Sequence, residues 1–475
     1  MNIAELYTLY KQRPAVTTDS RACPPGALFF ALRGESSDGN AYAEKALQAG
    51  CSHAVIDDAA AWAGERTILV DNALETLQQL ARLHRRTLGV TVIGITGTNG
   101  KTTTKELMAK VLSQKYSVLF TEGNLNNHIG VPLTLLRLTG RHEIAVVEMG
   151  ANHPGEIRDL AEIALPDYGL ITNVGYAHLE GFGSFEGVVR AKGELYDFLR
   201  RTDGRIFIDG DNRYLTEMAE GIEKTVYGKI PDVSPRRSDA GNVSGGKAPS
   251  VTGKVTHNYP FLSFRWQTPG AASPDVEAYD VETRLVGDYN LGNALAAIAA
   301  GLHFHVPPGL INGAISAYEP ANSRSQRKKT AGNTLVIDAY NANPSSMRAA
   351  LENFASAESR PGRTPPPEEE KELSGTTFSR GDSAPLRKAV ILGDMLELGE
   401  RSPELHGEII ALVKKCGFDS VLLCGEQFSA AGQTFTCFRD VDGLNEYLEA
   451  NPPRGCEILI KGSRGMHLEK IIHNL

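Results

Sequence analysis

Val90-Thr-Val-Ile-Gly-Ile-Thr-Gly-Thr-Asn-Gly-Lys-Thr-Thr-Thr104 joins an apolar run to a glycine-rich turn and then to a helical pattern. Val90 to Ile95 predicts a short buried strand, and Lys101 to Gln114 predicts a helix with one apolar face. Glycines between a strand and a helix let backbone N–H groups approach phosphate oxygens, and the helix N-terminus adds unpaired donors and the positive end of its dipole. The segment therefore predicts a phosphate-binding loop.

The residues of this loop have distinct expected roles. Lys101 can place a positive charge at the outer phosphates, and the Thr102 hydroxyl can bind Mg²⁺. The spacing differs from the usual P-loop, because Ile95 stands where the first glycine would fall, so a tight turn that binds nothing remains an alternative. A dinucleotide fingerprint fits worse, because a lysine follows the last glycine. The expected nucleotide contacts are Gly97, Thr98, Asn99, Gly100, Lys101, Thr102 and Thr103.

Strand-like and helical patterns alternate along the chain, which predicts an α/β fold with mostly parallel sheets. The length of 475 residues suggests about three domains. We expect a small α/β module over residues 1–88, a mostly parallel sheet with covering helices over 89–320, and a third, Rossmann-like module over 321–475. Two polar, turn-rich stretches, Pro231 to Tyr259 and Glu358 to Pro385, are predicted to be surface insertions, and the second is expected to be flexible.

Composition excludes several classes of protein. The formal net charge of −8 provides no basic field for a nucleic-acid backbone. Six scattered cysteines without a CxxC pair indicate free thiols in a reducing compartment. The N-terminus has no signal-peptide pattern and no apolar run approaches the length of a membrane span, so we expect a cytoplasmic protein. The absence of a coiled-coil pattern favours a monomer.

Polar residues follow several predicted strands. Glu148 ends an apolar run, and His178 follows the run Gly169 to Thr172. Because parallel strands end at the same edge of a sheet, both side chains are candidates for a site there. Each residue also has a structural interpretation: a loop carboxylate, a capping histidine and, for Lys192 further along the chain, an ordinary solvated lysine.

The loop Thr96 to Thr104, which contains GTNGKT, is similar to the ATP loop of Mur ligases and folylpolyglutamate synthases, and further segments over nearly the whole chain resemble the Mur family. The resemblance implies a three-domain Mur ligase architecture, with a UDP-substrate module, a central ATPase domain and a Rossmann-like C-terminal domain. It also implies an enzyme that uses ATP and Mg²⁺ to form an amide bond through an acyl phosphate.

The resemblance implies roles for individual residues. The catalytic residues would be Lys101, Glu148, His178 and Lys192. The metal ligands would be Thr102, Glu148, His178 and Lys192, the last as a carbamate formed with CO₂, which exchanges an ammonium for an anion. Further ATP contacts would come from Asn290, Arg324 and Asp338.

Other segments suggest the substrates. Thr18 to Arg21 resembles a UDP-sugar-binding element, although Asn40 stands where the family usually has histidine. The segments that follow Thr121 and Ile337 look most like the branch that adds D-Ala-D-Ala to a UDP-muramoyl tripeptide. The diaminopimelate-adding branch, a folylpolyglutamate synthase and a P-loop phosphotransferase or regulatory ATP-binding module remain alternatives. The expected substrate contacts are Ser20, Arg21, Asn124, Asn126, Asn127, Asn341, Ser463 and Arg464.

Overall fold

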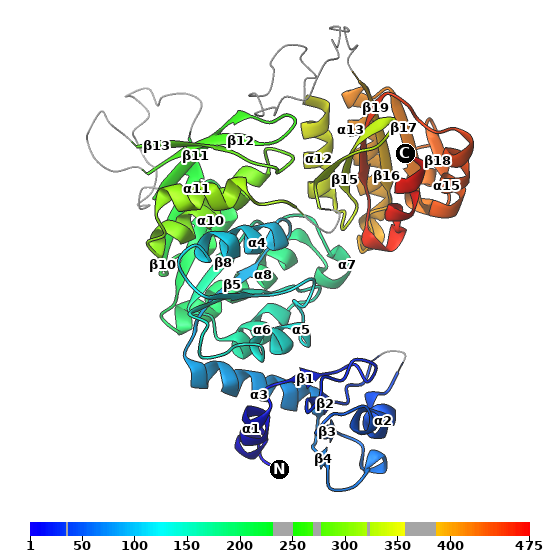
Figure 1. Ribbon diagram of the computed structural model, residues 1–475. Coiled ribbons are helices and arrows are strands. Elements are labelled where there is room, and N and C mark those ends of the chain that lie inside the picture. The colour runs from blue at the N-terminus through cyan, green and yellow to red at the C-terminus, as the bar shows by residue number, and fades with distance from the viewer. Residues whose placement is uncertain (35–36, 231–249, 269–276, 321–323, 357–385) are drawn as a thin grey trace, which may run out of the picture. The chain divides into compact units, whose positions relative to one another are not determined.

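The computed structural model describes residues 1–34, 37–230, 250–268, 277–320, 324–356 and 386–475. These residues form three β-sheets of four, nine and six strands, and helices flank each sheet (Figure 1). The predicted α/β class is confirmed. The chain divides into two compact units, of which the first comprises residues 1–254, 265–281 and 291–318 and the second comprises 255–264, 282–290 and 319–475. The boundaries expected after residues 88 and 320 stay predictions.

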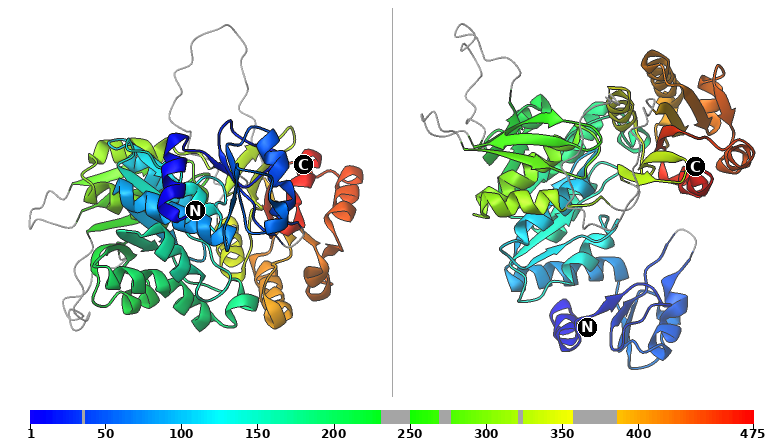
Figure 2. Two further views of the ribbon diagram at one scale, coloured as in Figure 1. Left: turned by 90° about the horizontal axis from the view of Figure 1, so that it is seen from below. Right: turned by 45° about the horizontal axis from the view of Figure 1, so that its top comes forward.

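The N-terminal sheet contains four parallel strands in chain order: β1 (Val16–Thr17), β2 (Leu28–Phe30), β3 (His53–Ile56) and β4 (Thr67–Leu69). Helix α2 packs against β2 and β3, and the two further views of the molecule show the same arrangement in blue (Figure 2). Strands β2 and β3 are largely buried, as expected for the centre of a small α/β module. The module also contains α1 (Ile3–Gln12), α2 (Ala43–Gln48), α3 (Ala73–Leu88) and the 3₁₀ turns η1 (Gly39–Tyr42) and η2 (Ala59–Ala61).

The nine-stranded sheet has the order β13-β12-β11-β10-β9-β8-β5-β7-β6, so β5 lies between β7 and β8. All three of these strands run parallel. The strands are β5 (Thr91–Thr96), β6 (Val118–Phe120), β7 (Ile144–Glu148), β8 (Tyr168–Ile171), β9 (Arg205–Asp209), β10 (Glu223–Lys229), β11 (Val251–His257), β12 (Ser263–Gln267) and β13 (Ala278–Glu282).

Helix α4 covers one face of this sheet, and α6 and α8 cover the other (Figure 1). The buried face of α4 includes Met108, Val111 and Leu112, as its apolar pattern predicts. The helices are α4 (Lys101–Leu112), α5 (Gly130–Leu135), α6 (Glu156–Ala164), α7 (Leu179–Phe182), α8 (Phe185–Arg201), α9 (Arg213–Met218), α10 (Asn290–His303) and α11 (Pro308–Ser316).

One of the predicted insertions is partly wrong. The stretch Pro231 to Tyr259 includes strand β11, which pairs in parallel with β10 through Tyr227 and Val251. Its polar, turn-rich composition concealed the strand, because only the side chains near its start are buried. Residues 231–249 and the second expected insertion, 358–385, lie outside the described residues.

The six-stranded sheet has the order β14-β15-β19-β16-β17-β18; β14 is antiparallel to β15, and the other pairs are parallel. Helix α12 begins at Pro344, because the Asn343 side chain accepts the Ser346 N–H at 2.9 Å and proline suits the first helical position. The elements are β14 (Gln326–Lys329), β15 (Asn333–Asp338), β16 (Arg387–Gly393), β17 (Ser420–Cys424), β18 (Thr436–Phe438), β19 (Cys456–Lys461), α12 (Pro344–Ser356), α13 (Ser402–Cys416), α14 (Glu426–Ala431), α15 (Val441–Ala450), η3 (Gly399–Arg401), η4 (Arg464–Met466) and η5 (Leu468–Asn474).

Two other expectations concern the whole chain. All six cysteines are free thiols, and Cys51, Cys424 and Cys456 are buried. Within the ranges that the structure describes, no helix has the length and apolar character that a membrane crossing requires.

Helix α3 is joined to the nine-stranded sheet by an ion pair in which the Arg85 side chain is buried and Asp167 is partly exposed. The Arg85 guanidinium donates to Asp167 Oδ2 at 2.8 Å and to the Leu165 carbonyl at 3.0 Å. The same Asp167 oxygen accepts the Val92 N–H at 2.8 Å, at the start of β5. Burial lowers the pKa of Arg85, and the Asp167 carboxylate opposes that shift. The pair therefore fixes the end of α3 against β5 and the segment before β8.

We expect Arg85→Leu to lower the free energy of unfolding by roughly 1–3 kcal/mol, because it removes charge-assisted hydrogen bonds from Asp167 and Leu165. Urea unfolding followed by circular dichroism measures the change. Arg86→Leu is the matched control, because Arg86 is the exposed neighbour on the same helix. Equal stability of the two variants would contradict the role assigned to Arg85.

Candidate active site

The predicted phosphate loop lies between β5 and α4, and two of its glycines cannot be replaced without strain. Gly97 and Gly100 have φ angles of +139° and +79°. A Cβ on Gly97 would lie 2.1 Å from Thr172 Oγ1, and a Cβ on Gly100 would lie 2.5 Å from Asn293 Oδ1. Glycine is therefore required at both positions by backbone conformation and by space.

The segment that follows β8 holds the loop in place. The Asn99 N–H donates to Asn173 Oδ1 at 3.0 Å, and Thr172 Oγ1 donates to the Asn99 carbonyl at 2.6 Å. Thr98 Oγ1 accepts the Gly175 N–H at 3.0 Å. These bonds come from a neighbouring strand end, so the loop conformation depends on the sheet as well as on its own glycines.

Lys101 is the first residue of α4, and its side chain folds back over the loop. Its Nζ donates to the Gly97 carbonyl at 2.7 Å and to the Thr98 carbonyl at 3.2 Å. Thr102 and Thr103 follow in the first turn of the helix, where Thr102 is buried. The ammonium thus lies at the loop that is expected to surround phosphate.

Glu148 is the last residue of β7, and its carboxylate brings three predicted residues together. Thr102 Oγ1 lies 3.2 Å from Oε1 and 3.0 Å from Oε2, and Asn126 Nδ2 donates to Oε1 at 2.9 Å. Only 2% of Glu148 is exposed. A buried carboxylate beside a hydroxyl presents the oxygen ligands that Mg²⁺ prefers.

Lys105 also contacts this carboxylate, and the sequence analysis did not identify it. Its side chain is fully buried, and its Nζ lies 3.7 Å from Glu148 Oε2 and 3.7 Å from Glu106 Oε1. The available signal was its spacing: Lys105 follows Thr102 by three residues, so both side chains lie on one face of α4.

His178 and Lys192 both contact the ring of Phe182. The His178 ring centroid lies 6.4 Å from that of Phe182, and Lys192 Nζ lies 5.0 Å from the Phe182 centroid. Lys192 Nζ also donates to the Ala151 carbonyl at 3.1 Å, close in sequence to Glu148. Burial, reinforced by repulsion from Lys101, lowers the pKa of Lys192 from its ordinary value of 10.5 to about 7.

The three asparagines of the loop after β6, Asn124, Asn126 and Asn127, make different contacts. Of these three, only Asn126 has a side chain that hydrogen-bonds to Glu148. The Asn127 side-chain oxygen accepts the Gly130 N–H at 2.9 Å and so stabilises the start of α5, and the Asn124 carbonyl accepts the Asn126 N–H at 2.8 Å. Asn126 is therefore the member of this group that lies at the candidate metal site.

In the N-terminal module, the predicted substrate residues lie in a short turn. The Arg21 guanidinium donates to Asp19, and the side-chain hydrogen bond is the main reason that the pKa of Asp19 is lowered to about 2. The Ser20 carbonyl accepts a thiol hydrogen bond. Asn40, which stands where histidine was expected, is buried and donates to Asp57 Oδ1 at 2.8 Å. Asn40 thus has a structural role in this module.

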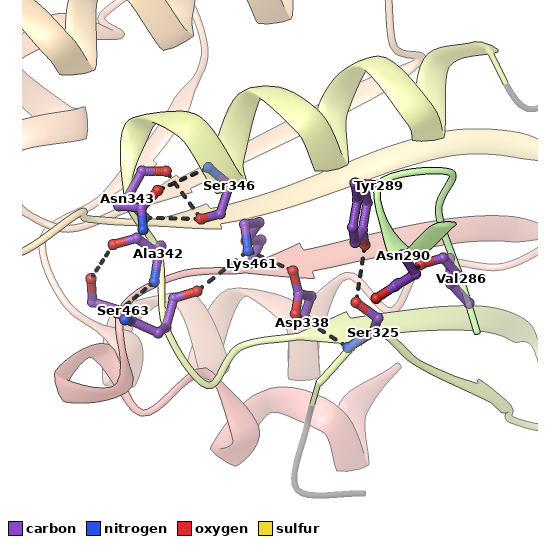
Figure 3. A network of polar contacts seen from close by, with 11 residues as sticks. Val286, Tyr289, Asn290, Ser325, Asp338, Ala342, Asn343, Ser346, Lys461 and Ser463 are labelled. Atoms are coloured by element: carbon purple, nitrogen blue, oxygen red, sulfur yellow. Dashed lines mark hydrogen bonds and ion pairs between the residues drawn. The ribbon is translucent and has the colours of Figure 1, made fainter. Parts of the chain in front are cut away.

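In the C-terminal sheet, Asp338 ends β15 and lies at the centre of a polar network (Figure 3). Its Oδ2 accepts from Lys461 Nζ at 2.5 Å, and its Oδ1 accepts the Ser325 N–H at 3.2 Å. Lys461 also donates to the Asn341 carbonyl at 3.3 Å, and Tyr289 OH lies 3.0 Å from Ser325 Oγ. Lys461 is 1% exposed and was not assigned a role from the sequence.

The remaining predicted residues of this unit lie in two groups. The Asn290 side chain donates to the Val286 carbonyl at 2.8 Å, at the start of α10 (Figure 3). The Arg324 and Arg464 guanidinium groups lie 3.7 and 5.2 Å from the ring centroid of Tyr340.

Ser463 binds the segment after β15 to the segment after β16. Its Oγ accepts the Leu396 N–H at 3.0 Å and donates to the Ala342 carbonyl at 3.4 Å. Ser463 therefore fixes the shape of this end of the C-terminal sheet.

Known proteins are similar to this chain in sequence and fold. The model of the Mur ligase middle domain matches residues 95–301, and that of the Mur ligase family, catalytic domain, matches residues 14–85. The chain is 34% identical to the UDP-N-acetylmuramoyl-tripeptide--D-alanyl-D-alanine ligase of Bacillus subtilis, over 97% of this chain and 92% of the relative. Its identity to the Escherichia coli protein of the same name is 32%, over 97% and 93%. A crystal structure of MurF from Acinetobacter baumannii has a TM-score of 0.80 at 27% identity and covers 97% of this chain and 93% of its own.

The lowered pKa of Lys192 predicts a pH-dependent stability. The unfolded chain keeps this proton up to pH values near 10.5, whereas the folded chain releases it at about 7. Between these values the unfolded state binds more protons, so the free energy of unfolding rises with pH. In CO₂-free buffer we expect a rise of roughly 2 kcal/mol from pH 7 to pH 9 that is lost in Lys192→Met. Urea unfolding at both pH values measures it, and the exposed Lys110→Met is the control; an unchanged pH dependence in Lys192→Met would contradict the shift.

Proposed function

This chain belongs to the Mur ligase family, and we propose that it uses ATP to join D-alanyl-D-alanine to UDP-N-acetylmuramoyl-tripeptide in peptidoglycan precursor synthesis. Two relatives that carry this activity in their names align with nearly the whole chain. The structural observation that supports ligase chemistry best is the buried Glu148 carboxylate, which Thr102 and Asn126 hold at the end of β7 beside the phosphate loop.

The reaction requires control of negative charge. The carboxylate of the tripeptide must attack the γ-phosphoryl group of ATP, and both groups are anionic. Lys101 reduces this repulsion, and the backbone donors of the loop hold the phosphates for in-line transfer. The amine of D-Ala-D-Ala then attacks the acyl phosphate, which yields the amide and releases phosphate, with ADP left from the first step.

The residues present fit a magnesium ion. The Thr102 hydroxyl and the Glu148 carboxylate converge at 3.0–3.2 Å, and both offer oxygen ligands. Among the described residues, no three His, Cys, Asp or Glu side chains form a metal-binding group. A further anionic ligand would come from the modified Lys192. His178 would be another ligand. Bound magnesium would supply positive charge to the phosphates.

We assign Lys192 as the site of carbamylation. Only a neutral amine attacks CO₂, and a pKa of about 7 leaves a substantial neutral fraction at neutral pH. The carbamate would carry a negative charge in place of an ammonium. It would therefore attract the metal and Lys101, which the unmodified ammonium repels.

The other predicted residues complete the proposed substrate sites. The UDP-linked substrate would contact Ser20 and Arg21, and the peptide would contact Asn126 and its loop. Asn290, Arg324 and Asp338 would bind ATP, and the cytoplasmic location and the monomeric state stay predictions. In the C-terminal domain, the proposed substrate contacts are Asn341, Ser463 and Arg464.

The reaction is tested with ATP, Mg²⁺, UDP-muramoyl tripeptide and D-Ala-D-Ala. We expect phosphate release together with a product whose mass includes D-Ala-D-Ala. Lys101→Ala and Glu148→Gln should each lower kcat at least ~100-fold, because they remove charge at the transferring phosphoryl group or at its metal. Lys110→Ala changes only an exposed lysine of α4 and should match the parent.

Assays with D-Ala-D-Ala, diaminopimelate and glutamate as acceptors distinguish the alternative functions. Incorporation of diaminopimelate or of glutamate in place of D-Ala-D-Ala would assign the chain to another branch of the superfamily. Phosphate release without any amide product would indicate a phosphotransferase or ATPase. Full activity of Glu148→Gln would contradict the proposed mechanism for all of these acceptors.

Carbamylation is tested separately with ¹³C-labelled bicarbonate. We expect one carbamate ¹³C resonance in the parent protein that grows as the pH rises through about 7, because the neutral amine becomes more abundant. Lys192→Arg keeps a positive charge and should lack the resonance, whereas Lys110→Arg should retain it. A resonance of equal intensity in Lys192→Arg would place the modification elsewhere.

A further inference from the structure

Lys105 is a charged group that the proposed mechanism does not use. It lies in the second turn of α4 with no exposed surface. Its Nζ has no hydrogen-bond partner among the residues that the structure describes, and its nearest charged neighbours are Glu148 and Glu106, each at 3.7 Å. The ring centroid of Phe120 lies 5.8 Å away. A buried ammonium without hydrogen bonds is costly, so these two carboxylates must stabilise its charge.

The two carboxylates are held independently of Lys105. Glu148 is 2% exposed and accepts hydrogen bonds from Thr102 and Asn126. The side chain of Glu106 is 23% exposed and accepts the Tyr318 hydroxyl at 2.7 Å. The ammonium is therefore equally distant from two fixed anions, one at the candidate metal site and one away from it.

We propose that Lys105 is the internal counter-ion of Glu148. When no metal is bound, the Lys105 ammonium compensates the Glu148 carboxylate. When a divalent cation binds, the Lys105 ammonium pairs with Glu106 instead. The inference rests on the proposed function, because that function makes Glu148 a magnesium ligand. Lys105 is then a positioning residue: it keeps Glu148 in place in the empty site and sets how tightly the metal is held.

This arrangement predicts opposite effects for the two neighbours. Without Lys105, the metal no longer competes with an ammonium for Glu148, so its affinity rises. Without the charge of Glu106, Lys105 has only Glu148 as a partner, so its competition with the metal is stronger and the metal affinity falls. General damage to the fold would weaken binding in both cases.

The test measures binding of Mn²⁺ alone to the full-length protein, with electron paramagnetic resonance of the free ion as the readout. We expect Lys105→Met to bind Mn²⁺ about tenfold more tightly and Glu106→Gln to bind it at least about threefold more weakly. The double variant should resemble Lys105→Met, because Glu106 acts through Lys105. Lys110→Met, on the exposed face of the same helix, should match the parent.

The outcomes separate this inference from the function on which it rests. If Glu148→Gln abolishes Mn²⁺ binding but Lys105→Met and Glu106→Gln shift it in the same direction or leave it unchanged, the counter-ion role is overturned and the metal role of Glu148 stands. If Glu148→Gln binds Mn²⁺ as the parent does, the metal role itself fails. Should Lys105→Met not fold, the loss of affinity in Glu106→Gln tests the proposal alone, since Glu106 is partly exposed.

Discussion

Parallel pairing of β5 with β7 and β8 is the constraint on which the candidate site depends. In this pairing Ile95 lies opposite Glu148, and Thr96 lies opposite Ile171. The glycine loop, the buried carboxylate and the segment that holds the loop therefore leave the sheet at one edge. Because side chains alternate between the two faces of a strand, a slip of one residue in this register would turn Glu148 to the opposite face.

Helix α4 converts this edge into a charged site. Its first turn provides Lys101 and Thr102, and its second turn provides Lys105 three residues later. The glycines allow the helix to begin directly at the strand end, so Thr102 and Lys105 both reach Glu148. Several charged side chains are thereby withdrawn from water, which a globular core disfavours unless the charges compensate one another.

Sequence patterns were most informative where local rules determine the structure. The buried strand Val90 to Ile95, the glycine turn after it and the apolar face of α4 are confirmed, because strand burial, backbone freedom and helix periodicity depend on neighbouring residues. Strand β11 was missed because it follows a polar stretch and buries few side chains. Lys105 and Lys461 were missed because a lysine is ordinarily solvated, and only the tertiary structure brings an acidic partner to it. The contact of Asn126 with Glu148 likewise depends on how the loop after β6 meets the end of β7.

The burial of Lys105 and Lys461 has a common physical explanation. Glu148 ends β7 and Asp338 ends β15, and the proposed function gives each a role in binding the nucleotide or its metal. An uncompensated carboxylate in such a site would repel the phosphates of a nucleotide. Lys105 lies 3.7 Å from the first acid, and Lys461 lies 2.5 Å from the second. Each lysine therefore offsets the negative charge of its acid, and the carboxylate oxygens can still act as ligands. The direct hydrogen bond between Lys461 and Asp338 fixes the Asp338 carboxylate as a hydrogen-bond acceptor. The longer contact between Lys105 and Glu148 leaves the Glu148 oxygens more accessible to a metal ion.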